Sequence, residues 1–175
     1  MTDFSWIENG SITSVPGFRA SGVTAGFKRS GAPDFAMIYS EKPASFAGVF
    51  TPCTFAAAPV RYDQQLVLRG GKLQAAIINS GNANACTGQT GAEAAAKSAA
   101  IAARILNIPA GSVAVASTGR IGVQMPMDIL ENGIRLAAEA LSDHGGNRAA
   151  EAIMTTDTVP VSGTRGPVSE CLRGS

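Results

Sequence analysis

The spacing of apolar residues along the chain distinguishes predicted strands from predicted helices. Apolar residues alternate with small or polar ones over Val113–Thr118, which is the period of a half-buried strand. Short apolar runs at Phe35–Tyr39 and Ala47–Thr51, separated by the break at Glu41-Lys42-Pro43, predict neighbouring antiparallel strands. A further run at Leu73–Ile78 predicts another strand. The first half of the chain is therefore expected to be rich in strands.

Helical patterns follow in the second half. Ala92–Leu106 is built from strong helix formers, and its many alanines would let it lie close to a sheet. Pro126–Leu141 has apolar residues near helical spacing, and Arg148–Met154 predicts a short third helix. Early strands followed by strand and helix in alternation indicate an α/β fold in layers with mixed strand pairing. Because no repeat or linker divides the sequence, residues 1–175 are expected to form one domain.

Charge and hydropathy exclude several classes of partner. The 175 residues carry a formal net charge of +1, and the basic residues are scattered, so neither nucleic acid nor a membrane surface is an expected partner. No apolar run approaches the roughly 20 residues that a membrane span needs. The N-terminal residues lack the basic and then apolar regions of a signal peptide, which makes the cytoplasm the expected location.

Cysteine and histidine usage limits the chemistry that the chain can support. Cys53, Cys86 and Cys171 are odd in number and widely spaced, so we expect reduced thiols and neither disulfides nor a zinc site. His144 is the only histidine, which leaves almost no material for a histidine-dependent triad or a metal centre. Cys86 lacks a neighbouring base that would activate it as a nucleophile. The sequence also lacks nucleotide-binding glycine motifs, so no cofactor is expected.

The segment after Val113 contains the first candidate for catalytic chemistry. Ser117-Thr118-Gly119 ends the alternating pattern with hydroxyl groups and a glycine, and Pro126 can open the next helix. A threonine O–H and an unshielded glycine N–H can both donate to one oxygen, so Thr118 and Gly119 are a candidate oxyanion hole. The same triplet is common in ordinary turns, and the local sequence leaves both interpretations open.

Two further polar segments are candidate binding elements. Asn79, Asn82 and Asn84 lie in a predicted structured loop, where their amides could contact a ligand or tie the loop to itself. Thr155 and Thr156 precede an aspartate and a third threonine, and these groups could hydrogen-bond a substrate or simply close a turn. Residue types alone do not decide between these interpretations.

Three segments taken together resemble the ornithine acetyltransferase, or glutamate N-acetyltransferase, family of arginine biosynthesis. The segments are Asn79–Gly88, Ser117–Gly122 with Met125-Pro126-Met127, and Ala152–Pro160. The likeness extends over residues 13–160. It implies a layered α-β-β-α sandwich of mixed sheets, the DmpA/ArgJ-like architecture that is similar to N-terminal-nucleophile hydrolases.

The resemblance also implies a mechanism and its partners. Family members are made as one precursor that cuts itself, and the new N-terminal threonine of the β chain is the nucleophile. An acetyl group passes from N-acetylornithine to this threonine and then to glutamate, and some members also use acetyl-CoA. By resemblance the α chain supplies the oxyanion hole, here Thr118 and Gly119, and a substrate-binding threonine that matches Thr155. The α and β chains are expected to form a heterotetramer.

The end of the chain departs from the family pattern. Residues 161–175 lack the lysine that the family usually has after Pro160, and they lack the later Ala-Thr cleavage site. We expect either a divergent or truncated α-chain end whose β partner is separate, or an incomplete gene product. In both cases the chain alone is expected to lack the nucleophile.

Two other functions compete with the α-subunit hypothesis. The chain could be a non-catalytic module that binds an amino acid through the asparagine-rich loop and the Thr155 segment. It could also be a related acyltransferase of secondary metabolism with another acyl acceptor. The sequence does not identify the acceptor.

Overall fold

The computed structural model describes residues 4–161 and 163–167. In chain order the elements are β1 (Phe4–Ile7), the 3-10 helix η1 (Ile12–Ser14), β2 (Phe18–Val23), β3 (Phe35–Ala44), α1 (Ala58–Arg69), β4 (Leu73–Asn82), α2 (Gly88–Leu106), β5 (Val113–Arg120), α3 (Met127–Glu139), α4 (Gly146–Ala152) and β6 (Thr164–Pro167). None of the helices in this part of the chain is both long enough and apolar enough to cross a membrane. Cys171 and residues 168–175 of the atypical tail lie outside the described residues.

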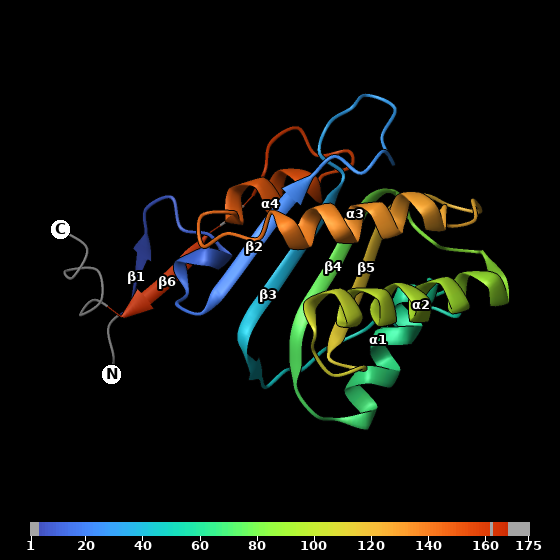
Figure 1. Ribbon diagram of the computed structural model, residues 1–175, viewed down its shortest axis with the longest axis horizontal. Coiled ribbons are helices and arrows are strands. Elements are labelled where there is room, and N and C mark those ends of the chain that lie inside the picture. Colours follow the sequence, from blue (N-terminus) through green and yellow to red (C-terminus); the bar gives the residue numbers. More distant parts are fainter. Residues whose placement is uncertain (1–3, 162, 168–175) are drawn as a thin grey trace.

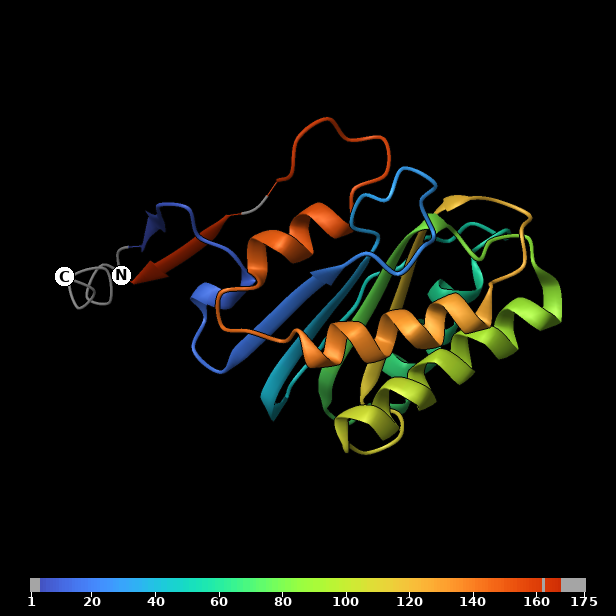
Figure 2. The same cartoon turned by 45° about the horizontal axis from the view of Figure 1, so that its top comes forward.

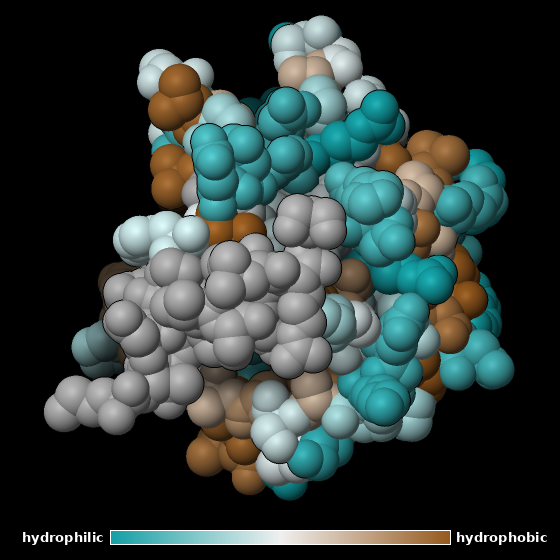
Figure 3. All heavy atoms as spheres, turned by 90° about the vertical axis from the view of Figure 1, so that its left-hand side faces the viewer, coloured by the Kyte–Doolittle hydropathy of each residue, from teal (hydrophilic) through white to brown (hydrophobic). Residues whose placement is uncertain are grey.

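The main sheet has the strand order β2-β3-β4-β5 (Figure 1). The β2–β3 and β3–β4 pairs are antiparallel, whereas β4 and β5 are parallel and are joined through α2. The mixed pairing expected from the sequence is therefore confirmed. The outer strands β1 and β6 form a separate antiparallel pair at one end of the molecule. From that side the visible surface is largely hydrophilic, with hydrophobic residues in scattered groups (Figure 3).

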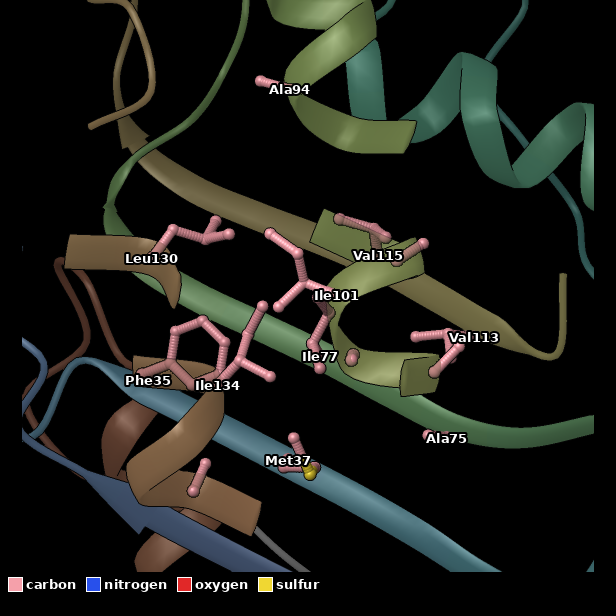
Figure 4. Packing of buried hydrophobic residues seen from close by; sticks show 14 of the residues in the cluster. Phe35, Met37, Ala75, Ile77, Ala94, Ile101, Val113, Val115, Leu130 and Ile134 are labelled. Carbon is pink, nitrogen blue, oxygen red and sulfur yellow. The ribbon is translucent and has the colours of Figure 1, made fainter. Parts of the chain in front are cut away.

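One face of the sheet carries the hydrophobic core. Phe35, Met37 and Ile77 point from β3 and β4 toward α2 and α3, where they meet Ile101 and Ile134 (Figure 4). These residues alternate along each strand with residues of the opposite face, as the period of a strand requires. The buried alanines of α2 let this helix lie close to the strands, as the sequence predicted.

The opposite face is covered in part by α4. Ala149 and Ala152 of this helix pack on Ala20 of β2 and Ala36 of β3. Gly22 allows this approach, because a Cβ atom there would lie 2.0 Å from a backbone oxygen of α4. Within the described residues, then, the chain supplies a helical layer and one sheet of the predicted sandwich, with α4 on the second face.

Helix α1 packs against the outer strand β5. The backbone N–H of Val115 donates to Asp63 Oδ1 at 3.1 Å, so a carboxylate of α1 occupies a donor at the free edge of the sheet. Burial raises the pKa of Asp63 to about 6 from its ordinary 3.8, and the bond from Val115 opposes part of that rise. This region was not assigned to a helix from its sequence.

The predicted strand at Ala47–Thr51 is wrong. This segment is irregular and pairs with no described strand; Val49 is almost fully exposed, and Phe50 lines a small pocket beside α1. Gly48 lies so close to the helix that a Cβ atom would be 3.2 Å from Val67 Cγ2. An apolar run is typical of a buried strand, but most of this segment is exposed, so its pattern did not indicate strand pairing.

The other differences concern element ends. Strand β4 continues past Ile78 to Asn82, and β5 continues past Thr118 to Arg120, so residues expected in loops belong to the sheet. Helix α2 begins at Gly88, four residues before the predicted start at Ala92. Helices α3 and α4 lie where they were expected, with small shifts at their ends.

Candidate functional site

The carboxyl ends of β4 and β5 lie side by side. The parallel register pairs Ser80 with Thr118 and Gly81 with Gly119. The loop between β2 and β3 and the segment after α4 reach the same end of the sheet (Figures 1 and 2). In α/β folds, ligands bind outside the carboxyl ends of parallel strands, so this end is the natural position for a site.

Thr118 and Thr155 are brought together here from distant parts of the chain. Thr118 Oγ1 lies 3.1 Å from Thr155 Oγ1, and either hydroxyl can be the donor. Val113 and Val115 are buried on the helix-covered face, so strand alternation places the Thr118 side chain on the opposite face, where Ala116 is exposed. Two of the residues expected to form one site from the family resemblance are thus in direct contact.

Gly119 occupies a position that excludes other residue types. Its φ of +130° lies in the region that favours glycine, and a Cβ atom would be 2.4 Å from the carbonyl carbon of Gly81. The N–H of Val115 faces the free edge, and the carbonyl of Arg120 faces the β4 side, where it accepts from Ala83 N–H. Gly119 follows Thr118 directly at the end of β5 and contributes to the wall of the neighbouring pocket.

The side chains of the three asparagines bond to groups of the chain itself. Asn79 Nδ2 donates to the Asn82 carbonyl at 2.8 Å, and its Oδ1 accepts from the Ser117 hydroxyl at 2.6 Å. Asn82 Nδ2 donates to two carbonyls of the segment that leads to α3, and Asn84 Nδ2 donates to the Gly91 carbonyl. All three side chains are buried. These contacts favour a structural role for Asn79, Asn82 and Asn84 over direct ligand contact.

An open pocket of about 610 Å³ adjoins the threonine pair. Gly81 and Gly119 contribute to its wall, and Thr155 and Thr156 line it from the segment after α4. The candidate residue Thr156 therefore shares the pocket with Thr155. Phe27 forms an apolar part of the wall.

Sequence reasoning missed three cationic residues of this pocket. Lys28 and Arg29 line it from the loop between β2 and β3, and Arg120 lines it from the end of β5. In the sequence, 90 residues lie between Arg29 and Arg120. The one available signal was the position of Arg120 directly after the Thr118-Gly119 pair.

Cys86 and His144 lie outside this pocket. Cys86 is an exposed free thiol that lines another pocket, of about 380 Å³, together with Arg61 and the start of α2. His144 is exposed on a turn, where its Nε2 lies 3.7 Å from an oxygen of Asp143. Neither residue lines the pocket that contains Gly119 and Thr155.

Known proteins of one family are similar to this chain over most of its length. The sequence model of the ArgJ family matches residues 19–166. The arginine biosynthesis bifunctional protein ArgJ of Gloeobacter violaceus is 47% identical over 159 residues, which are 91% of this chain and 39% of that protein. The Streptomyces coelicolor protein of the same name is 51% identical over 150 residues, 85% of this chain and 39% of that protein. The chain thus spans about 39% of the length of these relatives.

Two solved structures share the fold. Ornithine acetyltransferase of Mycobacterium tuberculosis, solved in complex with ornithine, superposes with a TM-score of 0.87 at 39% identity, covering 95% of this chain and 94% of that chain. The ArgJ protein of Bacillus halodurans gives a TM-score of 0.83 at 40% identity, covering 95% of this chain and 93% of that chain. The fold class expected from the sequence is thereby confirmed. Sequence and fold agree with the three motifs, and the chain belongs to the ArgJ family.

Proposed function

We propose that this chain is the α subunit of a glutamate N-acetyltransferase that moves an acetyl group from N-acetylornithine to glutamate in arginine biosynthesis. A β chain with an N-terminal threonine supplies the nucleophile. The proposal further includes a heterotetramer, which rests on the family resemblance. A cytoplasmic location and the lack of a cofactor are also part of it, and they rest on the sequence patterns described above. The ornithine bound to the Mycobacterium tuberculosis relative supports an amino-acid substrate.

Contact between the Thr118 and Thr155 hydroxyls beside Gly119 is the observation that carries this proposal. In each half-reaction the attacking atom adds to the acyl carbonyl, and the carbonyl oxygen becomes negatively charged in the tetrahedral intermediate. The Thr118 O–H and the Gly119 N–H are the proposed donors to this oxygen. Because strand pairing and the contact to Thr155 already hold both groups, little reorganisation is needed when the charge develops.

Thr155 has a second role in the proposal. Its hydroxyl fixes the orientation of the Thr118 hydroxyl at 3.1 Å, and its exposed position at the pocket leaves it open to the substrate. A threonine nucleophile can use its own α-amino group as the base, so the chemistry needs no histidine at this site.

Acyl transfer can be tested by complementation. The full chain would be co-expressed with the β chain of the Gloeobacter violaceus relative, and formation of N-acetylglutamate from N-acetylornithine and glutamate would be measured. We expect Thr118→Ala to lower kcat by about 10²–10³, the usual effect of removing one oxyanion donor. Thr118→Ser keeps the hydroxyl and should retain much of the activity. The same assay with acetyl-CoA in place of N-acetylornithine tests whether the complex also uses acetyl-CoA as an acetyl donor.

Thr90→Ala is the matched control, because Thr90 is exposed on α2 and lies outside the pocket. It should leave kcat unchanged. Equal turnover of the Thr118→Ala complex and the unmodified complex would remove Thr118 from the oxyanion hole.

A further inference from the structure

Three cationic side chains converge on the pocket next to the proposed oxyanion hole. Lys28, Arg29 and Arg120 line it, and the described residues that line it include no acidic side chain. Arg29 and Arg120 are exposed, and neither they nor Lys28 form an ion pair within the described part of the chain. The described lining of the pocket therefore carries three cationic side chains and no carboxylate, which suits an anionic group.

The loop that carries Lys28 and Arg29 is held in place by a buried carboxylate. Asp34 is fully buried, and its two oxygens accept from the backbone N–H groups of Ala25 at 2.6 Å, Gly26 at 3.1 Å and Lys28 at 2.8 Å. The Lys28 Nζ also donates to the Pro33 carbonyl at 2.8 Å. The cations thus extend from a loop with a defined backbone.

Arg120 is fixed from the other side of the pocket. Its Nε donates to the Gly81 carbonyl at 3.2 Å, which anchors the guanidinium beside the paired ends of β4 and β5. Nε is used in this way, and the described residues offer no partner to the two terminal nitrogens. A guanidinium presents parallel N–H groups that match the two oxygens of a carboxylate.

We propose that Lys28, Arg29 and Arg120 form a carboxylate-binding wall that holds the α-carboxylate of the amino-acid substrates. This inference rests on the proposed function and specifies part of its substrate site. N-acetylornithine and glutamate share an α-carboxylate next to the nitrogen that carries or receives the acyl group. Their side chains end in opposite charges, an ammonium in one and a carboxylate in the other. A cationic wall suits the group that they share, and it would repel the ornithine ammonium.

Placement of the wall agrees with the order of groups in the substrate. With the acyl oxygen at Thr118 and Gly119, the α-carboxylate lies a few bonds away, and Arg120 follows Gly119 directly in the chain. The hydroxyls of Thr155 and Thr156 line the same pocket and can add hydrogen bonds to the carboxylate oxygens.

Binding can be measured on the full chain without its β partner. Titration of the ¹⁵N-labelled chain with N-acetylornithine is expected to shift the amide signals of Gly81, Gly119 and Arg120, with a millimolar Kd that weakens as salt is added. The methyl ester of N-acetylornithine keeps the acyl amide and the ammonium but lacks the carboxylate. We expect its Kd to be at least about tenfold higher, since a tenfold change corresponds to the loss of one charge-assisted contact.

Variants of the wall provide the second arm of the test. Arg29→Gln/Arg120→Gln should raise the Kd for N-acetylornithine at least about tenfold. The control Arg104→Gln/Arg135→Gln removes two exposed charges from α2 and α3 and should leave the Kd unchanged. Both pairs change the net charge equally, so their difference separates local contacts from long-range attraction.

Three results would overturn the carboxylate wall: equal binding of the ester and the acid, equal binding by the wall variant and the control, or no shift at the three amides. Coenzyme A is titrated in parallel, and a site that responds to it but not to N-acetylornithine would be a phosphate site, which also overturns the proposal. Binding of N-acetylornithine needs no nucleophile. If the chain binds the carboxylate as expected but the complex with the β chain transfers no acetyl group, the result counts against the proposed function and leaves the carboxylate wall standing.

Discussion

Asp34 offers the sharpest prediction about how the fold supports the site. Its carboxylate accepts from three backbone N–H groups of one loop, and the side chain is fully buried. In Asp34→Asn, one oxygen remains an acceptor and the other becomes an NH₂ group of nearly the same size. Whichever way the amide is oriented, at least one N–H of the loop then faces a donor instead of an acceptor.

The expected loss follows from the contacts. If the remaining oxygen is Oδ1, which accepts from Ala25, the Lys28 N–H loses its acceptor and the Gly26 N–H keeps only its longer bond to Oδ1 at 3.4 Å. A buried donor left without a partner costs about 1–3 kcal/mol, and Gly26 contributes the smaller part because it keeps its longer bond. We therefore expect Asp34→Asn to lower the free energy of unfolding by about 3 kcal/mol.

Urea unfolding of the full chain, followed by circular dichroism at pH 7, measures this loss. The midpoint should fall while the m-value stays the same, because the surface exposed on unfolding is unchanged. Asp143→Asn serves as control, since Asp143 is exposed and its replacement should leave the midpoint where it is. A loss below about 1 kcal/mol in Asp34→Asn would refute the reasoning, because water would then be replacing the carboxylate.

Three further predictions concern other parts of the chain. Asp63 has its pKa raised to about 6, so the folded chain holds this proton more tightly than the unfolded chain, and the stabilisation is complete below about pH 4 and lost as the pH rises through 6. Asp63→Asn should reduce the change in unfolding free energy between pH 4 and pH 7 by about 1–2 kcal/mol, which is less than the roughly 3 kcal/mol of the full pKa shift because the carboxyl is partly solvated. Urea unfolding at the two pH values measures this change, and an equal change in the variant and the unmodified chain would contradict the raised pKa of Asp63. Gly119 has a positive φ, and a Cβ atom there would lie 2.4 Å from Gly81, whereas Gly111 has φ +85° with open space around it. Gly119→Ala should therefore lower Tm much more than Gly111→Ala, and equal losses of Tm would count against a close approach of β4 and β5. Ile134→Ala removes a fully buried side chain and should cost about 2–5 kcal/mol in urea unfolding, so a loss under about 1 kcal/mol would show a loosely packed core.

Periodicity predicted those elements whose burial follows one simple rule. Strand β5 and helices α2 and α3 each bury one face, so their apolar residues repeat at the period of the element. The end of β4 was missed because Asn79 and Asn82 are polar and a glycine lies between them. Their side chains are satisfied by hydrogen bonds from within the chain, and a pattern of hydropathy carries no information on such partners.

The candidate site shows the same limit more strongly. Thr118, Gly119 and Thr155 were selected together because of a family resemblance, and no local spacing indicates that residues 118 and 155 touch. Lys28 and Arg120 were read as scattered charges, since only the pairing of β4 with β5 and the Asp34-bound loop bring them to one pocket. Contacts between distant residues depend on topology, which a single sequence specifies only indirectly.

The bond between Asp63 and Val115 also restricts how another polypeptide could extend the sheet. Strand β5 is the outermost strand next to β4, and an outer strand is a template on which foreign strands can add. An incoming strand would find the Val115 donor occupied by a carboxylate and the adjacent stretch covered by α1. The Asp63 carboxylate thus caps the middle of an outer strand whose far end, at Gly119, belongs to the candidate site, so protection against aggregation and a reactive end coexist on one strand.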